Sequence, residues 1–156
     1  MCFENGVYFL RDQFFLDFPD PYLKGNHSGR RPHYYAFRDN ATGLLWMIPL
    51  SKQHGKLADY VRRTAGGRIC DVYHLTALGG VSGVLLIADM FPIIEDYIRE
   101  PYTMEGQPVV FKDKSDIRAI DVKVRKVMAM LRRGVKFTKT QPDVFKIERE
   151  LLTRRG

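Results

Sequence analysis

The chain has 156 residues, of which 45% are hydrophobic and 28% charged, and its net charge is +7. A chain of this length and composition suits one domain, residues 1–156, which can bury a core without help from disulfides or metals. Ten Phe and eight Tyr supply more apolar surface than disordered sequences carry. Disorder is therefore excluded for the bulk of the chain.

Several other classes are also excluded. The longest apolar run, residues 83–94, is interrupted by Asp89 and Pro92 and is far shorter than the roughly 20 residues that span a bilayer. The first residues lack the basic start and apolar stretch of a secretory signal, and two cysteines make no disulfide framework. The histidines show no metal-binding spacing. We therefore expect a cytoplasmic protein with no metal, no cofactor and no membrane partner.

The positive charge is concentrated in one part of the sequence. Residues 1–111 carry 11 Lys and Arg against 12 Asp and Glu, a net charge of −1, whereas residues 112–156 carry 14 against 6, a net charge of +8. Such a localised basic block indicates a polyanionic partner such as a nucleic acid. A solvated helix face would carry the same charges, and the residue types alone do not separate the two interpretations.

The first two thirds of the chain predict short strands joined by turns. Residues 7–10 favour a strand, and the aromatic stretch 14–18 is ended by prolines. Residues 33–38 and 44–50 are two more strand-like runs. The turn-forming pentapeptide between them predicts a hairpin.

Beyond the hairpin, the apolar spacing becomes helical over residues 52–64, with Ser51 as the expected N-cap. Further strand-like runs cover residues 68–73, 83–88, 93–98 and 109–111.

The last third of the chain predicts two helices. One begins at a cap on Ser115 and ends at Gly134, and the other covers about residues 142–152. The polar faces of the first helix carry a set of basic residues: Arg118, Lys123, Arg125, Lys126, Arg132 and Arg133. Together the elements indicate an α+β fold, a small curved antiparallel sheet with helices packed on or around it.

Reactive side chains gather where the second hairpin strand meets the predicted helix: Ser51, Lys52, His54 and Lys56. Backbone N–H groups at a helix start favour an anion, lysines add positive charge, and a histidine exchanges protons near neutral pH. On residue types alone, a simple capping serine beside solvated lysines is the favoured interpretation.

A second group of candidate residues precedes and enters the first hairpin strand: Lys24, Arg30, Arg31, His33 and Tyr34. Arginines beside a histidine and aromatic rings are suited to holding an RNA backbone and stacking a base. A basic loop followed by an ordinary core strand would have the same composition.

The hairpin connects these two groups, so we expect His33 and Ser51 to lie near each other at one end of the sheet. Arg31, Lys52 and His54 would then surround the same anion. A histidine that accepts a proton, and cations that stabilise a pentacoordinate phosphate, are what RNA cleavage by its own 2′-hydroxyl requires. The sequence therefore predicts metal-free cleavage of RNA at this end of the sheet.

A set of segments occurs in a characteristic order along the chain. It comprises a Tyr/Phe-rich N-terminal strand, an Arg-Pro-His-Tyr strand entry, a Trp-Met-Ile-Pro-Leu-Ser strand end followed by lysines, Asp-Met-Phe-Pro-Ile-Ile at residues 89–94, and a long basic helix. In these features the chain resembles the toxins of type III toxin–antitoxin systems, the ToxN/AbiQ group, and most closely the CptN and TenpN branches. The resemblance implies an SH3-like, MazF/Kid-type β-barrel elaborated with helices.

The resemblance also implies a function. Such toxins are metal-independent endoribonucleases that leave 2′,3′-cyclic phosphate and 5′-hydroxyl ends. A repeated, pseudoknotted antitoxin RNA, which the toxin processes, inhibits them in a closed toxin–RNA assembly, and several act in phage defence by abortive infection. The family's lysine before the second strand falls on His33. Its Thr/Ser and lysine fall on Ser51, Lys52 and either His54 or Lys56.

We therefore predict that His33 accepts the 2′-hydroxyl proton while Ser51 orients the phosphate. Lys52 would stabilise the phosphorane, and His54 or Lys56 would protonate the leaving oxygen. The basic helix is predicted to grip the phosphates of the folded antitoxin RNA, and cellular or phage RNA would be the substrate. The alternative is a non-catalytic RNA-binding module with the same basic helix.

Overall fold

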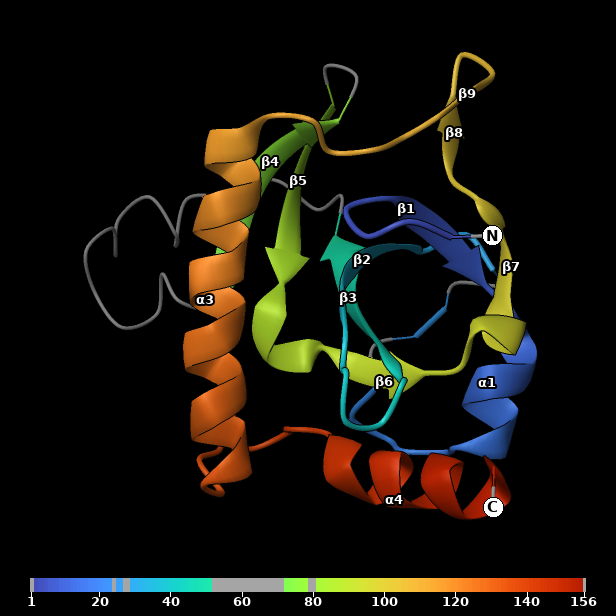
Figure 1. The fold of residues 1–156 in the computed structure, drawn as a ribbon, viewed down its shortest axis with the longest axis vertical. Coiled ribbons are helices and arrows are strands. Elements are labelled where there is room, and N and C mark those ends of the chain that lie inside the picture. The colour runs from blue at the N-terminus through green and yellow to red at the C-terminus, as the bar shows by residue number, and fades with distance from the viewer. Residues whose placement is uncertain (1, 24, 27–28, 52–71, 79–80, 156) are drawn as a thin grey trace.

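The computed structural model describes residues 2–23, 25–26, 29–51, 72–78 and 81–155 (Figure 1). Its elements are β1 (Val7–Leu10), α1 (Asp12–Asp17), β2 (Pro32–Arg38), β3 (Leu45–Ser51), β4 (Tyr73–Leu78), β5 (Val81–Leu86), η2 (Ile87–Asp89), β6 (Phe91–Ile93), η3 (Glu95–Tyr97), β7 (Ile98–Pro101), β8 (Thr103–Met104), β9 (Gln107–Pro108), α3 (Lys114–Arg132) and α4 (Val144–Arg155). The helix predicted over residues 52–64 lies outside these ranges.

The predicted hairpin is confirmed in strands β2 and β3. Their register runs from His33 opposite Pro49 to Arg38 opposite Leu45, with an irregularity between Tyr35 and Phe37. This pair forms the centre of an antiparallel sheet in the order β4-β5-β3-β2-β1-β7, and β6 pairs with the start of β3. The α+β class and the mostly antiparallel sheet are therefore as predicted.

The β-barrel that the resemblance implies is not closed, because β4 and β7 end the strand order and do not pair with each other in the described part of the chain. The carbonyl of Val72 accepts a hydrogen bond from the N–H of Ile87, so the next carbonyl, that of Tyr73, points away from β5. Lys123 of α3 donates to this Tyr73 oxygen at 2.9 Å. A helix thus lies along the edge where a closing strand would pair, as Figure 1 shows for α3 beside β4.

The predicted long basic helix is α3, although its N-cap is Asp113 and not Ser115. The Asp113 carboxylate accepts hydrogen bonds from the N–H groups of Ser115 and Asp116, which are unpaired at a helix start. Gly134 ends the helix with a φ of +86°, a conformation that favours glycine. One stripe of α3 is buried: Ile120, Val124, Val127 and Leu131.

The aromatic stretch 14–18, expected among the strands, belongs mostly to the helix α1. Its residues Phe14 and Phe18 are four apart, so they lie on one side of the helical turn, and both are buried. Phe14 stacks on Phe91 of β6 with ring centroids 5.0 Å apart. Strand periodicity and helical periodicity are hard to separate over so few residues.

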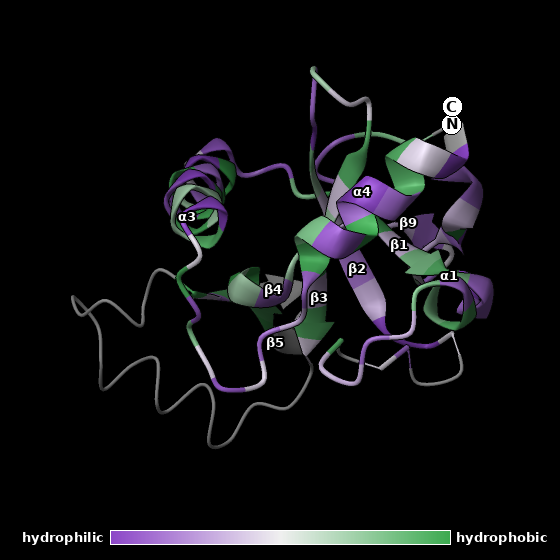
Figure 2. Ribbon diagram, turned by 90° about the horizontal axis from the view of Figure 1, so that it is seen from below, coloured by the Kyte–Doolittle hydropathy of each residue, from purple (hydrophilic) through white to green (hydrophobic). Residues whose placement is uncertain are grey.

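Trp46 of β3 is the centre of a second aromatic cluster, to which α4 contributes. The Phe37 ring lies parallel to that of Trp46, and Phe145 of α4 packs on the same indole. Arg132, at the end of α3, lies over the Phe145 ring and forms two hydrogen bonds with the Glu148 carboxylate, at 3.1 and 3.0 Å. Seen from below in Figure 2, α4 crosses this end of the sheet.

Candidate functional site

The open end of the β2–β3 hairpin brings His33, Arg31 and Ser51 together. His33 pairs with Pro49, and Ser51 follows two residues later on β3, so strand alternation places both side chains on one face of the sheet. Arg31 lies just before β2 and donates through Nη1 to the carbonyl of Leu50 at 3.4 Å. Its Nε also donates to the carbonyl of Gly25 at 2.6 Å.

His33 is completely buried beneath this surface. Its ring lies 5.5 Å from that of Phe91 and 6.3 Å from that of Phe15. Neither ring nitrogen has a hydrogen-bond partner in the described part of the chain. Burial, together with the positive charge of Arg31, lowers the pKa of His33 to about 3. The imidazole is therefore neutral at pH 7.

The other residues of the first group differ in their exposure. Arg30 is exposed, and Arg31 is half-buried with a pKa lowered by burial. Tyr34 lies in the core, where its hydroxyl donates to Asn5 Oδ1 at 2.8 Å and its ring packs on Phe111. Four candidate residues lie outside the described ranges: Lys24, Lys52, His54 and Lys56.

Of the six predicted basic residues on α3 and its C-cap, five are exposed: Arg118, Arg125, Lys126, Arg132 and Arg133. The half-buried Lys123 donates to the Tyr73 carbonyl, and the exposed Arg132 is paired with Glu148. The exposed set recurs at helical spacing along the outer side of α3 and carries the charge that a polyanion would meet.

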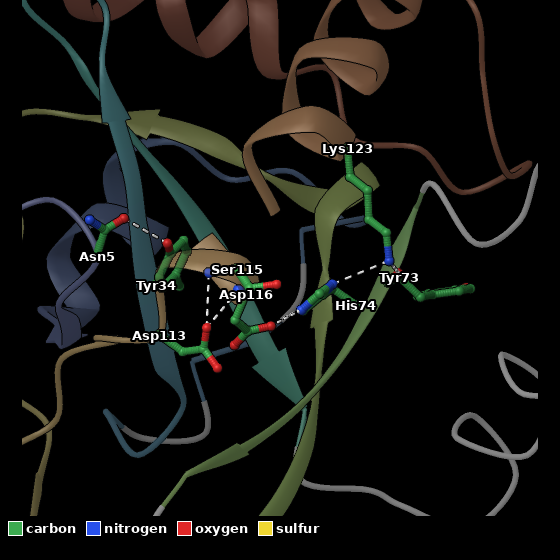
Figure 3. Close-up of polar contacts among 8 residues, drawn as sticks. All are labelled: Asn5, Tyr34, Tyr73, His74, Asp113, Ser115, Asp116 and Lys123. Carbon is green, nitrogen blue, oxygen red and sulfur yellow. Dashed lines mark hydrogen bonds and ion pairs between the residues drawn. The ribbon is translucent and has the colours of Figure 1, made fainter. Parts of the chain in front are cut away.

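Sequence patterns gave no sign of a polar cluster formed by His74, Asp116 and Lys123 (Figure 3). His74 Nε2 lies 2.5 Å from Asp116 Oδ1, and Lys123 Nζ lies 3.2 Å from His74 Nδ1. An ammonium group only donates, so Nδ1 is the acceptor and Nε2–H donates to the carboxylate. Burial lowers the pKa of His74, against the opposing effect of Asp116. This neutral histidine connects α3 to the edge strand β4.

The two buried histidines lie on opposite faces of the sheet. His74 pairs with Leu85, and Leu85 pairs with Leu50, whose side chain points away from that of its neighbour Ser51. Their contacts agree with this assignment, because His33 packs on α1 and β6 whereas His74 bonds to α3. The hairpin end and the basic helix therefore belong to different sides of the molecule.

Comparison with known proteins identifies the fold. No protein-family model matches the chain, and no curated protein matches it in sequence. Among solved structures, AbiQ, a lactococcal anti-phage endoribonuclease of a type III toxin–antitoxin system, superposes with a TM-score of 0.70 at 12% identity, over 96% of this chain and 97% of AbiQ.

Two further structures give the same result. One is from a bacterial type III toxin–antitoxin system in which a non-coding RNA pseudoknot selectively inhibits the toxin; it has a TM-score of 0.70 at 17% identity, over 98% of this chain and 99% of that one. The other is from a bacterial antiviral system regulated by a processed non-coding RNA, with a TM-score of 0.65 at 12% identity, over 94% and 96%.

Within the described ranges, no helix is long and apolar enough to cross a membrane. The resemblance noted in the sequence is confirmed at the level of the fold: over nearly its whole length, the chain has the fold of type III toxin–antitoxin proteins.

Proposed function

We propose that this protein is a metal-independent endoribonuclease toxin of a type III toxin–antitoxin system. It would cleave RNA by attack of the 2′-hydroxyl, leaving 2′,3′-cyclic phosphate and 5′-hydroxyl ends. One observation carries the proposal: on a fold shared with an anti-phage endoribonuclease, the hairpin places His33 and Ser51 on one face with Arg31 bonded to the same strand end. A proton acceptor, a hydroxyl and a cation are thereby gathered at one place.

In the proposed mechanism, Ser51 orients the phosphate, and the residues after it supply charge and a proton. Lys52 would stabilise the phosphorane, and His54 or Lys56 would protonate the leaving 5′-oxygen. Such groups act by favouring charge that develops only in the transition state. Arg31 adds a positive charge that is held in place by its bond to the Leu50 carbonyl.

His33 is the proposed acceptor of the 2′-hydroxyl proton, and its burial sets a condition on that role. The neutral imidazole has an acceptor nitrogen, but a pKa of about 3 makes it a weak base in the free protein. Phe15 and Phe91 pack on its ring. Proton transfer to His33 therefore requires these rings to give way when RNA binds, which would also raise its pKa by restoring solvent.

RNA capture is assigned to the exposed basic residues of α3, which meet phosphates without reading the base sequence. We propose that they hold a repeated, pseudoknotted antitoxin RNA that the enzyme trims and that inhibits it in a closed toxin–RNA assembly. Lys123 is left out of this surface because it is half-buried and donates to the Tyr73 carbonyl, and Arg132 because both of its terminal nitrogens are bonded to Glu148. Phage defence is the proposed biological role.

The test is incubation of the purified protein with single-stranded RNA in EDTA. Cleavage with cyclic-phosphate and 5′-hydroxyl ends is expected, and a Ser51→Ala variant should cut more slowly. Retention of RNA without cleavage would contradict the proposal and support the non-catalytic RNA-binding module. Cleavage only after addition of a divalent metal would contradict the metal-independent chemistry.

A further inference from the structure

A groove of about 520 Å³ lies between α3 and β2, away from the open end of the β2–β3 hairpin where His33 and Ser51 lie. One wall is a face of α3 and the other is formed by Ala36 and Phe37 of β2, with Glu4 at its rim. Its α3 wall consists of Asp121, Val124, Arg125, Met128 and Ala129, which recur at helical spacing. The volume is in the range of small-molecule and cofactor sites. We call it the α3–β2 groove.

Most of the groove surface is apolar, but Asp121 places a carboxylate within it. This side chain is half-buried, and no hydrogen bond or ion pair to the carboxylate occurs in the described part of the chain. Burial raises its pKa, and the nearby positive charge of Arg125 opposes the rise. A carboxylate accepts but does not donate hydrogen bonds. An occupant that supplies donors would therefore be held here.

The charge around the groove restricts the kind of occupant. Arg118, Lys126 and Arg133 are exposed on the same helix as Arg125, and residues 112–156 carry a net charge of +8. Within the groove itself the charged groups are the carboxylates of Glu4 and Asp121 and the guanidinium of Arg125. An occupant that combines an anionic part for Arg125 with a flat, donor-bearing part for Asp121 matches both kinds of charge.

We propose that the α3–β2 groove binds a guanine nucleotide of the RNA, with the base between Phe37 and Met128, the Asp121 carboxylate accepting from its Watson–Crick edge, and Arg125 contacting its phosphate. Guanine presents two adjacent donors, N1–H and the N2 amino group, which match the two carboxylate oxygens. Adenine and cytosine present one amino group beside an acceptor, which a carboxylate repels. The inference rests on the proposed function, because it takes RNA as the ligand, and it adds a base preference outside the site of cleavage.

The test follows the Met128 methyl group by NMR in protein labelled at its methionine methyls, with the signal assigned through Met128→Leu. The probes are GMP, AMP, CMP and UMP. We expect GMP to shift the signal with an affinity about tenfold or more above that of AMP, the usual scale for a bidentate base contact. Asp121→Asn should abolish this preference for GMP. The unfolding midpoint of this variant should not fall, because the carboxylate that is removed accepts no hydrogen bond within the part of the protein that the structure describes. Glu105→Gln, an exposed carboxylate outside the groove, is the matched control.

Equal affinities for GMP and AMP, or an unchanged preference in Asp121→Asn, would overturn the proposal. Arg125→Leu provides a second variant, which should weaken all four nucleotides and leave their order unchanged. Failure of the proposed function is distinguishable, since it would appear as absent RNA cleavage in EDTA alongside an intact preference for GMP. Normal RNA cleavage in EDTA, together with equal affinities for GMP and AMP at the Met128 signal, would reject the groove proposal and leave the proposed function intact.

Discussion

His33 and His74 are two buried histidines on opposite faces of one sheet, and their surroundings differ. His74 has a partner at each ring nitrogen, Asp116 at one and Lys123 at the other. His33 packs against the rings of Phe15 and Phe91 close to the charge of Arg31, and neither of its ring nitrogens has a hydrogen-bond partner in the described part of the chain. Burial lowers the pKa of both, so both are neutral at pH 7.

The difference separates a structural role from a candidate catalytic one. A buried polar group with all its partners holds elements together, whereas one without partners costs stability and needs another reason to be present. His74 connects α3 to β4 across 42 residues of sequence. His33 lies next to the hairpin end that carries Ser51, where a group able to accept a proton has a use.

The largest expected effect is on RNA cleavage after His33→Leu. Leucine fills a similar volume without ring nitrogens, so the free energy of unfolding should not fall at pH 7. Cleavage should slow by about 10²–10⁴-fold if the imidazole accepts the proton. Gel-based cleavage rates and urea unfolding measure the two effects. Cleavage at the parent rate would remove His33 from the mechanism.

A smaller effect, on stability and not on cleavage, is expected for His74→Leu. The substitution leaves Asp116 and Lys123 without their shared partner, which should lower the free energy of unfolding by about 1–3 kcal/mol. RNA cleavage should stay within a few-fold of the parent below the unfolding transition. A loss of cleavage equal to that of His33→Leu would contradict the division between the two histidines.

A separate effect is the pH dependence of stability that His33 contributes. Its pKa is about 3 when folded and about 6.5 when unfolded, so below pH 6.5 the unfolded chain binds the extra proton. The stability is fully present above pH 6.5 and is lost as the pH falls towards 3, by at most about 1.4 kcal/mol per pH unit. Urea unfolding between pH 7 and pH 4 should show a shallower decline for His33→Leu. Parallel curves would mean that His33 titrates normally.

The sequence predicted the hairpin well because its signals are local. Strand-forming runs on either side of a turn-forming pentapeptide determine both the pairing and the neighbourhood of His33 and Ser51. The long basic helix was equally clear from its apolar stripe. The cap was placed at Ser115 because a serine before an apolar run is a common start, whereas the Asp113 carboxylate reaches the same N–H groups.

Other features depend on contacts that no local pattern records. A closed barrel and an open sheet need the same strands, and the contact of Lys123 of α3 with the edge strand β4 leaves no local mark in the sequence. The sequence likewise does not indicate that Lys123 bonds to the Tyr73 carbonyl or that Arg132 pairs with Glu148, since a paired and an unpaired cation look alike in sequence. The burial of His33 depends on Phe15 and Phe91, which come from distant segments.

The position of α4 affects when the molecule becomes complete during its synthesis. The backbone N–H of Asp143 donates to Asp20, Gln141 donates to the carbonyl of Ala88, and Phe145 packs on Trp46. The ribosome makes all of these partners before it makes α4. A nascent chain therefore carries a Trp46 that lacks its Phe145 contact until α4 has emerged, and the fold is completed only after synthesis of this helix.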